Sequence, residues 1–143
     1  MILYLDASAL VKRYVAEVGS PQVEQVIAQA NIKATAIISR AEVSAALGKA
    51  ARMGTLSREE ASMALQAFRS EWANLPRIAL TEAIIARADE QAWEHGLRGY
   101  DAVHLAAAIF WQEAMGERVT LATFDRQLWQ TAKVIGLAVW PAA

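Results

Sequence analysis

The sequence predicts an α/β domain built as a three-layer α/β/α sandwich around a mostly parallel central sheet. Short apolar runs alternate with helix-length amphipathic segments along the whole chain. The first apolar run ends at an aspartate, and serine caps, prolines and glycines mark where helices begin and end. Because strands and helices alternate, neighbouring strands should run parallel, with helices on both faces of the sheet.

The first part of the chain predicts two strands separated by two helices. Residues 2–5 are apolar at every position, which is typical of a strand buried on both faces. Residues 33–38 are rich in β-branched and small apolar side chains and predict a second strand. Between them, Gly19 ends one helix, and Ser20 with the proline after it begins another. These helices span residues 8–17 and 21–30.

The middle of the chain predicts two helices that form a hairpin. Each opens with the S-x-x-E spacing of a capping box, at Ser39 and at Ser57. Gly54 separates them, and Pro76 ends the second. They span residues 39–53 and 57–75.

The last part of the chain again predicts strands that alternate with helices. Thr81 caps a helix, and glycines bracket a tight link at 96–99 before a helix that is apolar nearly all round and should be buried. The strands span residues 77–80, 118–122 and 137–140, and the helices 81–95, 101–115 and 125–135. Trp72, Trp93 and Trp111 fit core faces of their helices, and a tryptophan left exposed would indicate a partner surface.

Composition indicates one cytoplasmic domain and excludes several classes of protein. A chain of 143 residues, 55% of them apolar, fits a single domain over residues 1–143. The lack of cysteine excludes disulfides and thiolate metal sites, and two histidines argue against a zinc site. The N-terminus lacks the basic region of a signal peptide, and the most apolar run, 102–111, is about half the length of a membrane span. The net charge of −1 argues against a non-specific nucleic-acid coat, but not against a nuclease with an acidic site.

The positions of the acidic residues point to a shared site. The chain has four aspartates against eleven glutamates, so the choice of aspartate is informative. Asp6, Asp101 and Asp125 each stand where one element has ended and a helix begins, and Glu42 lies one turn into the helix after the second strand. Ligands of open parallel sheets bind outside the carboxyl ends of the strands, where Asp6, Glu42 and Asp125 should emerge, and Asp101 should enter at a helix start.

Four carboxylates in one pocket would need a cation. Two of them about 4 Å apart repel by roughly 4 kcal/mol at an effective dielectric near 20. Mg²⁺ or Mn²⁺ prefers carboxylate and water oxygens and would neutralise the cluster. Such a site is typical of phosphodiester hydrolysis, in which the metal acidifies and orients a water and stabilises the leaving oxygen. For any single acid, helix capping alone would account for its position, and Glu42 completes a capping box with Ser39.

Four segments together resemble a known family. They are residues 4–10 (YLDASAL), 39–43 (SRAEV), 100–108 (YDAVHLAAA) and 123–128 (TFDRQL). In this order and spacing the chain resembles the PIN-domain ribonucleases over essentially its whole length, and more narrowly the VapC-type toxins of bacterial toxin–antitoxin pairs. The resemblance implies a PIN-like α/β/α sandwich, an endoribonuclease activity dependent on Mg²⁺ or Mn²⁺, an RNA substrate, a separately encoded antitoxin protein and a homodimer.

The resemblance also implies roles for particular residues. By position, Asp6, Glu42, Asp101 and Asp125 would be the catalytic, metal-binding acids. Ser8 and Thr123 match the small hydroxyl positions beside the first and last acids, where they would orient carboxylates or water. Some relatives carry further acids near the last position, and Asp125 has no acidic neighbour, which leaves the number of metal ions open.

Arginines and one histidine lie close to these acids. Arg40, Arg98 and Arg126 are candidates for RNA contact because a guanidinium suits bidentate phosphate binding, with Arg13 a weaker candidate. The alternative is that each pairs with a neighbouring carboxylate or stands in water. His104 lies three residues after Asp101 on the same helix face, where a structural hydrogen bond to a carbonyl or carboxylate is favoured over a role as general acid.

Two other functions remain open from the sequence. An aspartyl-phosphate phosphatase or receiver-like domain also carries an aspartate after its first strand, but it would need a second nearby aspartate and a lysine after a later strand. The only late lysine, Lys133, lies in the middle of a predicted helix. A non-catalytic binding module that kept the acidic pocket is the other alternative.

Overall fold

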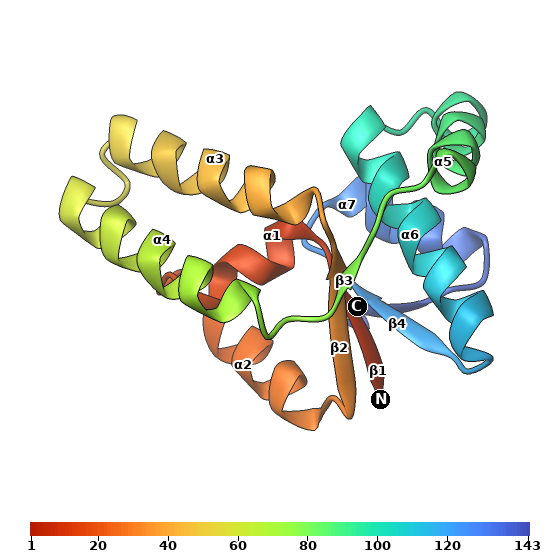
Figure 1. The fold of residues 1–143 in the computed structure, drawn as a ribbon, viewed down its shortest axis with the longest axis horizontal. Coiled ribbons are helices and arrows are strands. Elements are labelled where there is room, and N and C mark those ends of the chain that lie inside the picture. Colours follow the sequence, from red (N-terminus) through yellow and green to blue (C-terminus); the bar gives the residue numbers. More distant parts are fainter.

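The computed structural model describes residues 1–143, with strands and helices in the predicted order. Figure 1 shows the sheet between two groups of helices. The elements are β1 (Ile2–Leu5), α1 (Ala7–Leu10), the 3₁₀ helix η1 (Val11–Arg13), α2 (Ser20–Gln29), β2 (Ile32–Ala36), α3 (Ser39–Arg52), α4 (Arg58–Trp72), β3 (Arg77–Ile78), α5 (Glu82–His95), α6 (Gly99–Met115), β4 (Val119–Ala122), α7 (Arg126–Val134) and β5 (Ala138–Trp140). No helix is long and apolar enough to span a bilayer.

The five strands form one parallel sheet in the order β3-β2-β1-β4-β5. The chain moves outward from β1 through β2 to β3, then returns to the other side of β1 as β4 and β5. The two halves of the sheet therefore diverge between β1 and β4. In open parallel sheets, the carboxyl ends of such a strand pair form the crevice in which ligands bind.

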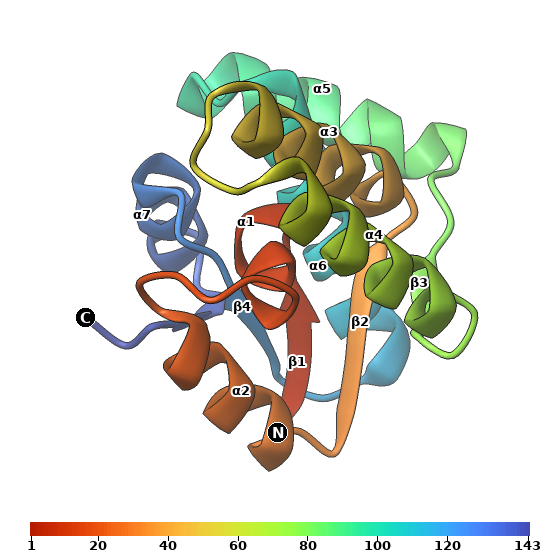
Figure 2. The same ribbon diagram turned by 90° about the vertical axis from the view of Figure 1, so that its left-hand side faces the viewer.

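Helices cover both faces of the sheet, which confirms the predicted three-layer sandwich. Ile2 and Tyr4 of β1 pack in a core with α5, α6 and α7, whereas Leu3 and Leu5 pack in a second core with α1, α2, α3 and α4. Figure 1 shows the two helical layers on opposite sides of the sheet, and Figure 2 looks onto the layer of α1–α4. Because β1 is buried on both faces, its sequence is apolar at every position and does not alternate.

The predicted helical hairpin is present as α3 and α4 (Figures 1 and 2). At α4 the capping box is confirmed, since Ser57 accepts from the Glu60 amide and Glu60 accepts from the Ser57 amide. At α3 the prediction of a capping box is wrong. Ser39 is itself the first helical residue, and its buried hydroxyl contacts Thr35 Oγ1 at 2.6 Å, so that Glu42 is left free to contact another group.

Two further predictions are wrong. The helix predicted at 8–17 ends after α1 and η1, because Ser20 donates to the carbonyl of Val15 and accepts from the amide of Glu17, which holds this stretch as a loop.

Trp93 is 91% exposed, not in the core. It lies nine residues after the buried Ile84, half a turn round α5 from the packed face. Trp72 is buried and Trp111 packs partly buried against the core, as predicted.

Candidate active site

Two of the predicted acids lie at the crevice between β1 and β4. Asp6 follows β1 and accepts from the Ala9 amide at 2.9 Å, and Asp125 follows β4 and accepts from the Leu128 amide at 2.9 Å. Each is therefore the N-cap of the next helix, as the capping interpretation predicted. Capping engages only Oδ1 of each carboxylate, so Oδ2 is left for other partners.

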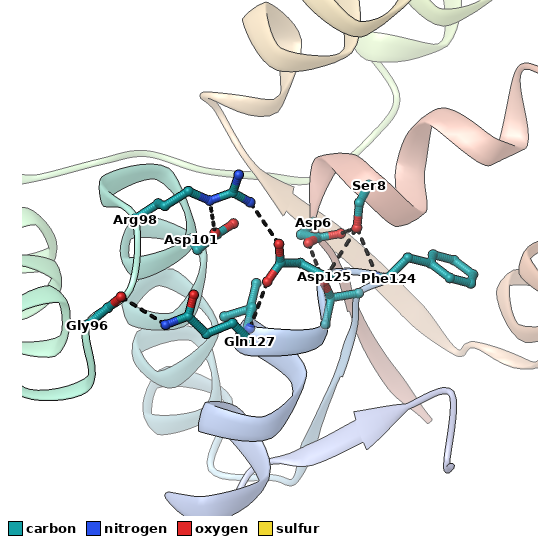
Figure 3. Close-up of polar contacts among 10 residues, drawn as sticks. Asp6, Ser8, Gly96, Arg98, Asp101, Phe124, Asp125 and Gln127 are labelled. Atoms are coloured by element: carbon teal, nitrogen blue, oxygen red, sulfur yellow. Dashed lines mark hydrogen bonds and ion pairs between the residues drawn. The ribbon is translucent and has the colours of Figure 1, made fainter.

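Two hydroxyls join the segments that follow β1 and β4 (Figure 3). Ser8 donates to Asp6 Oδ1 at 2.7 Å, and Thr123 donates to Asp6 Oδ2 at 2.5 Å. In turn, the Phe124 amide donates to Ser8 Oγ and the Asp125 amide donates to Thr123 Oγ1. The carboxylate of Asp6 is thus fixed, and the backbone that carries Asp125 is fixed to it.

Arg98 connects Asp101 to Asp125. Its Nε donates to Asp101 Oδ2 at 3.0 Å, and its Nη2 donates to Asp125 Oδ2 at 2.7 Å. Figure 3 shows the guanidinium reaching from the start of α6 toward the acid that precedes α7. Of the two interpretations of Arg98, phosphate contact or pairing with a carboxylate, the structure has the second, although the side chain is 74% exposed.

Glu42 meets a buried pair of side chains. Its Oε1 lies 2.6 Å from Nε2 of His104, and Nδ1 of His104 lies 2.7 Å from the hydroxyl of Tyr4. The structural hydrogen bond predicted for His104 is therefore present, with a carboxylate as partner. Tyr4 was not among the predicted site residues, because inside an apolar strand a tyrosine differs from its neighbours by one hydroxyl; its place two residues before Asp6 was the available signal.

Burial makes two of the acids, Asp6 and Asp101, costly to ionise. Burial raises the pKa of Asp6, although His104 and the hydrogen bonds from Thr123, Ser8 and Ala9 act in the opposite direction. Burial also raises the pKa of Asp101, the charge of Asp125 raises it further, and Arg98 opposes both. A nearby cation stabilises the charged form of such buried carboxylates and so opposes the effect of burial on their pKa.

The donor set suits a hard divalent cation, although the side chains do not surround a common point. All four acids offer carboxylate oxygens, which Mg²⁺ and Mn²⁺ prefer. As the side chains stand, no three of the histidine, aspartate and glutamate residues converge closely enough to hold a metal. For Asp101 and Asp125, Arg98 explains the lack of convergence, because its guanidinium lies between the two carboxylates, where a metal cation would lie.

The other arginines differ in their surroundings. Arg13 donates to Glu71 and Glu24 on the layer of α1–α4, so it pairs with carboxylates. Arg40, in the first turn of α3, and Arg126, at the first position of α7, are exposed and form no ion pair. A cavity of about 320 Å³ lies beside Asp125, and its lining includes Arg126 and Trp129. Two exposed guanidinium groups that form no ion pair are thus carried close in the chain to Glu42 and Asp125.

The PIN domain family model matches residues 3–134 of this chain. Ribonuclease VapC45 of Mycobacterium tuberculosis (strain CDC 1551 / Oshkosh) is 34% identical over 142 residues, 99% of this chain and 96% of that protein. Ribonuclease VapC3 of Pyrobaculum aerophilum is 36% identical over 128 residues, 90% of this chain and 92% of that protein.

Solved structures have the same fold. The structure of FitAcB from Neisseria gonorrhoeae superposes with a TM-score of 0.66 at 19% identity, over 97% of this chain and 96% of that chain. A toxin–antitoxin complex from Klebsiella pneumoniae superposes with a TM-score of 0.59 at 16% identity, over 82% and 83% of the two chains. The family match over most of the sequence and the relatives above 30% identity establish that this chain belongs to the PIN domain family and, within it, to the VapC-type ribonucleases.

Proposed function

We propose that this protein is an endoribonuclease that depends on Mg²⁺ or Mn²⁺ and acts as the toxin of a toxin–antitoxin pair. The observation that carries the proposal is the link between Asp6 and Asp125 through Thr123, at the point where the two halves of the sheet diverge. Asp101 is joined to this pair by Arg98. The ribonuclease names of relatives at 34% and 36% identity support the same activity.

In this proposal, Asp6, Glu42, Asp101 and Asp125 hold the divalent cation. Ser8 and Thr123 orient the Asp6 carboxylate by donating to its two oxygens. A cation held there would supply Lewis acidity toward a phosphodiester and a water activated for attack on it. The protein contributes fixed carboxylates in a buried site, where electrostatic interactions are stronger than in water.

Arginines would bind the RNA backbone beside the acids. Arg40 and Arg126 are exposed and form no ion pair with a protein carboxylate, and they lie two residues before Glu42 and directly after Asp125. Arg98 would exchange its contacts with Asp101 and Asp125 for phosphate oxygens when RNA and metal bind. The cavity next to Asp125 gives a flexible RNA strand room beside the acids.

The proposal includes two protein partners. A separately encoded antitoxin is suggested by the toxin–antitoxin complex that shares this fold. Its segment would lie in a groove between the early helices and place a basic side chain among the acids, a position that Arg98 occupies here with the chain's own guanidinium. We also infer a homodimer that acts in the cytoplasm, and the exposed Trp93 offers the kind of ring that interfaces cover.

Cleavage of RNA by the purified protein tests the activity. The wild type should cut structured cellular RNA in Mg²⁺ or Mn²⁺ and lose that activity in a chelator, and Asp101→Asn should remove it. Asp89→Asn is the matched control, because Asp89 is the one aspartate outside the site and lies exposed on α5. Sequencing of cellular RNA ends after expression of the wild type and of Asp6→Ala would identify the target.

Two results would overturn the proposed function. Cleavage by Asp101→Asn at the rate of the wild type would exclude the proposed site. RNA binding by the wild type without cleavage at any divalent metal concentration would favour a binding module that lacks catalysis.

A further inference from the structure

A chain of three side chains ties Glu42 to the core of the protein. Tyr4 Oη lies 2.7 Å from Nδ1 of His104, and His104 Nε2 lies 2.6 Å from Oε1 of Glu42. The three residues come from β1, α6 and α3, and the contact between His104 and Glu42 joins a helix of one layer to a helix of the other. Tyr4 is 0% exposed and His104 is 1% exposed.

Chemistry assigns the direction of both hydrogen bonds. A carboxylate only accepts, so the contact with Glu42 requires a proton on Nε2 of His104. The phenol of Tyr4, whose reference pKa is about 10, is protonated at neutral pH and donates to Nδ1. A neutral imidazole with its proton on Nε2 satisfies both contacts at once.

Packing alone does not require this network. His104 stands in a stretch of α6 whose other buried neighbours, Ala102 to Ala108, are apolar. The hydrogen bond between the neutral side chains of Tyr4 and His104 adds little net stability, and apolar groups of the same shape in place of these two partners would be nearly neutral. The network therefore matters for the one group it reaches at the active site, the carboxylate of Glu42.

Glu42 benefits from such an anchor. Its side chain has three rotatable bonds and projects from the first turn of α3, and it is 24% exposed. Without a partner it would sample many rotamers and lose that freedom on binding a metal. His104 holds Oε1, while Oε2 has no hydrogen-bond partner in the protein.

We propose that His104, held by Tyr4, is a positioning residue that fixes Oε1 of Glu42 and leaves Oε2 to the active-site cation. The inference rests on the proposed function for the presence of that cation. Groups that hold a ligand side chain from behind raise metal affinity, and their loss typically lowers it about 10- to 100-fold.

Titration with Mn²⁺ tests the inference without turnover. His104→Leu, which removes the donor, should weaken Mn²⁺ binding about 10- to 100-fold. His104→Gln keeps an N–H donor for Glu42 and should restore a large part of the affinity. Tyr4→Phe removes one hydroxyl and keeps the ring, and it should cost about 2- to 10-fold. Leu105→Val, at a neighbouring buried position of α6 in the apolar core, is the control for altered packing and should bind Mn²⁺ as the wild type does.

The tautomer of His104 gives a second readout, in the metal-free protein. Nitrogen NMR should find the proton on Nε2 of His104 and a shifted equilibrium in Tyr4→Phe, with His95 as the only other histidine signal. A proton found on Nδ1 of a neutral ring would overturn the inference. Wild-type Mn²⁺ affinity in folded His104→Leu would also overturn it, as would wild-type affinity in Tyr4→Phe if His104→Leu does not fold.

The two proposals fail in different ways. A wild type that binds Mn²⁺ but cleaves no RNA overturns the proposed function and leaves the positioning role standing. A wild type that cleaves RNA while His104→Leu keeps both its Mn²⁺ affinity and its kcat overturns only the positioning role. A wild type that binds no Mn²⁺ overturns both.

Discussion

Nη2 of Arg98 lies 2.7 Å from Oδ2 of Asp125, so that a residue at the start of α6 contacts the acid that begins α7. The same guanidinium donates to Asp101. These contacts raise the pKa of Arg98, the hydrogen bond with Asp101 having the largest effect, so the side chain stays charged. The guanidinium of Arg98 thus binds two of the carboxylates that would bind a metal ion. Arg98 and the metal ion must therefore compete for Asp101 and Asp125.

The first prediction concerns this competition. Arg98→Gln should tighten Mn²⁺ binding about two- to fivefold in the absence of RNA, a small factor because exposed ion pairs are weak. Isothermal titration calorimetry measures it directly. Arg118 is an exposed arginine directly before β4, at the amino end of that strand and so away from the acids. Arg118→Gln should therefore leave the affinity unchanged. Weaker Mn²⁺ binding in Arg98→Gln would mean that the guanidinium supports the metal site.

The second prediction concerns pH and Asp6. Because burial raises the pKa of Asp6, the folded protein holds this proton more tightly than the unfolded chain, whose aspartates titrate near about 3.9. Ionised Asp6 therefore costs stability above its raised pKa, and the cost disappears as the pH falls toward about 4. In a chelator, Asp6→Asn should be more stable than the wild type at pH 7.5, and the difference should shrink toward pH 4.

Asparagine suits this test because it is also a good N-cap, so α1 keeps its first hydrogen bond. Denaturant melts at a series of pH values give the difference in the free energy of unfolding. Added Mn²⁺ should stabilise the wild type and not Asp6→Asn. An Asp6→Asn protein less stable than the wild type at pH 7.5 in chelator would contradict the assigned cost of burial.

The third prediction concerns Thr123, whose hydroxyl joins Asp6 to the backbone of Asp125. Thr123→Val keeps the shape of the side chain and removes the hydrogen bonds that Thr123 forms with Oδ2 of the buried Asp6 and with the Asp125 amide. It should lower the free energy of unfolding by about 1–3 kcal/mol and weaken Mn²⁺ binding. Thr131→Val, at a buried threonine of α7 that contacts neither acid, should leave Mn²⁺ binding at the wild-type level.

The fourth prediction concerns RNA binding by Arg40 and Arg126. In an Asp101→Asn background that should not cleave, each substitution to glutamine should weaken RNA binding. Each should also flatten the plot of log affinity against log salt by about 0.7 to 0.9 if it removes one phosphate contact. Arg52→Gln, at the exposed far end of α3, is the control. An unchanged salt slope in both variants would place the RNA elsewhere.

The order of the strands and helices follows from local patterns in the sequence. Apolar runs, the cap at Ser57 and the glycines that end helices act within a few residues, so the strands and helices were predictable with small errors at their ends. The errors arose where a serine side chain took a different hydrogen-bond partner from the one that its capping pattern predicts. Ser39 bonds to Thr35 instead of capping α3, and Ser20 holds the chain before it as a loop.

The acids of the site could be predicted because the carboxyl ends of parallel strands must share one edge of the sheet. The hydrogen-bond partners of these acids could not be predicted, because a hydrogen bond between residues 27, 62 or 100 positions apart produces no periodic pattern in the sequence. The sequence by itself determined the α/β class, the order of the elements and the candidate acids. Only the tertiary structure decided that Arg98 stands between Asp101 and Asp125 and that Tyr4 and His104 hold Glu42, since such contacts depend on how the layers pack against one another.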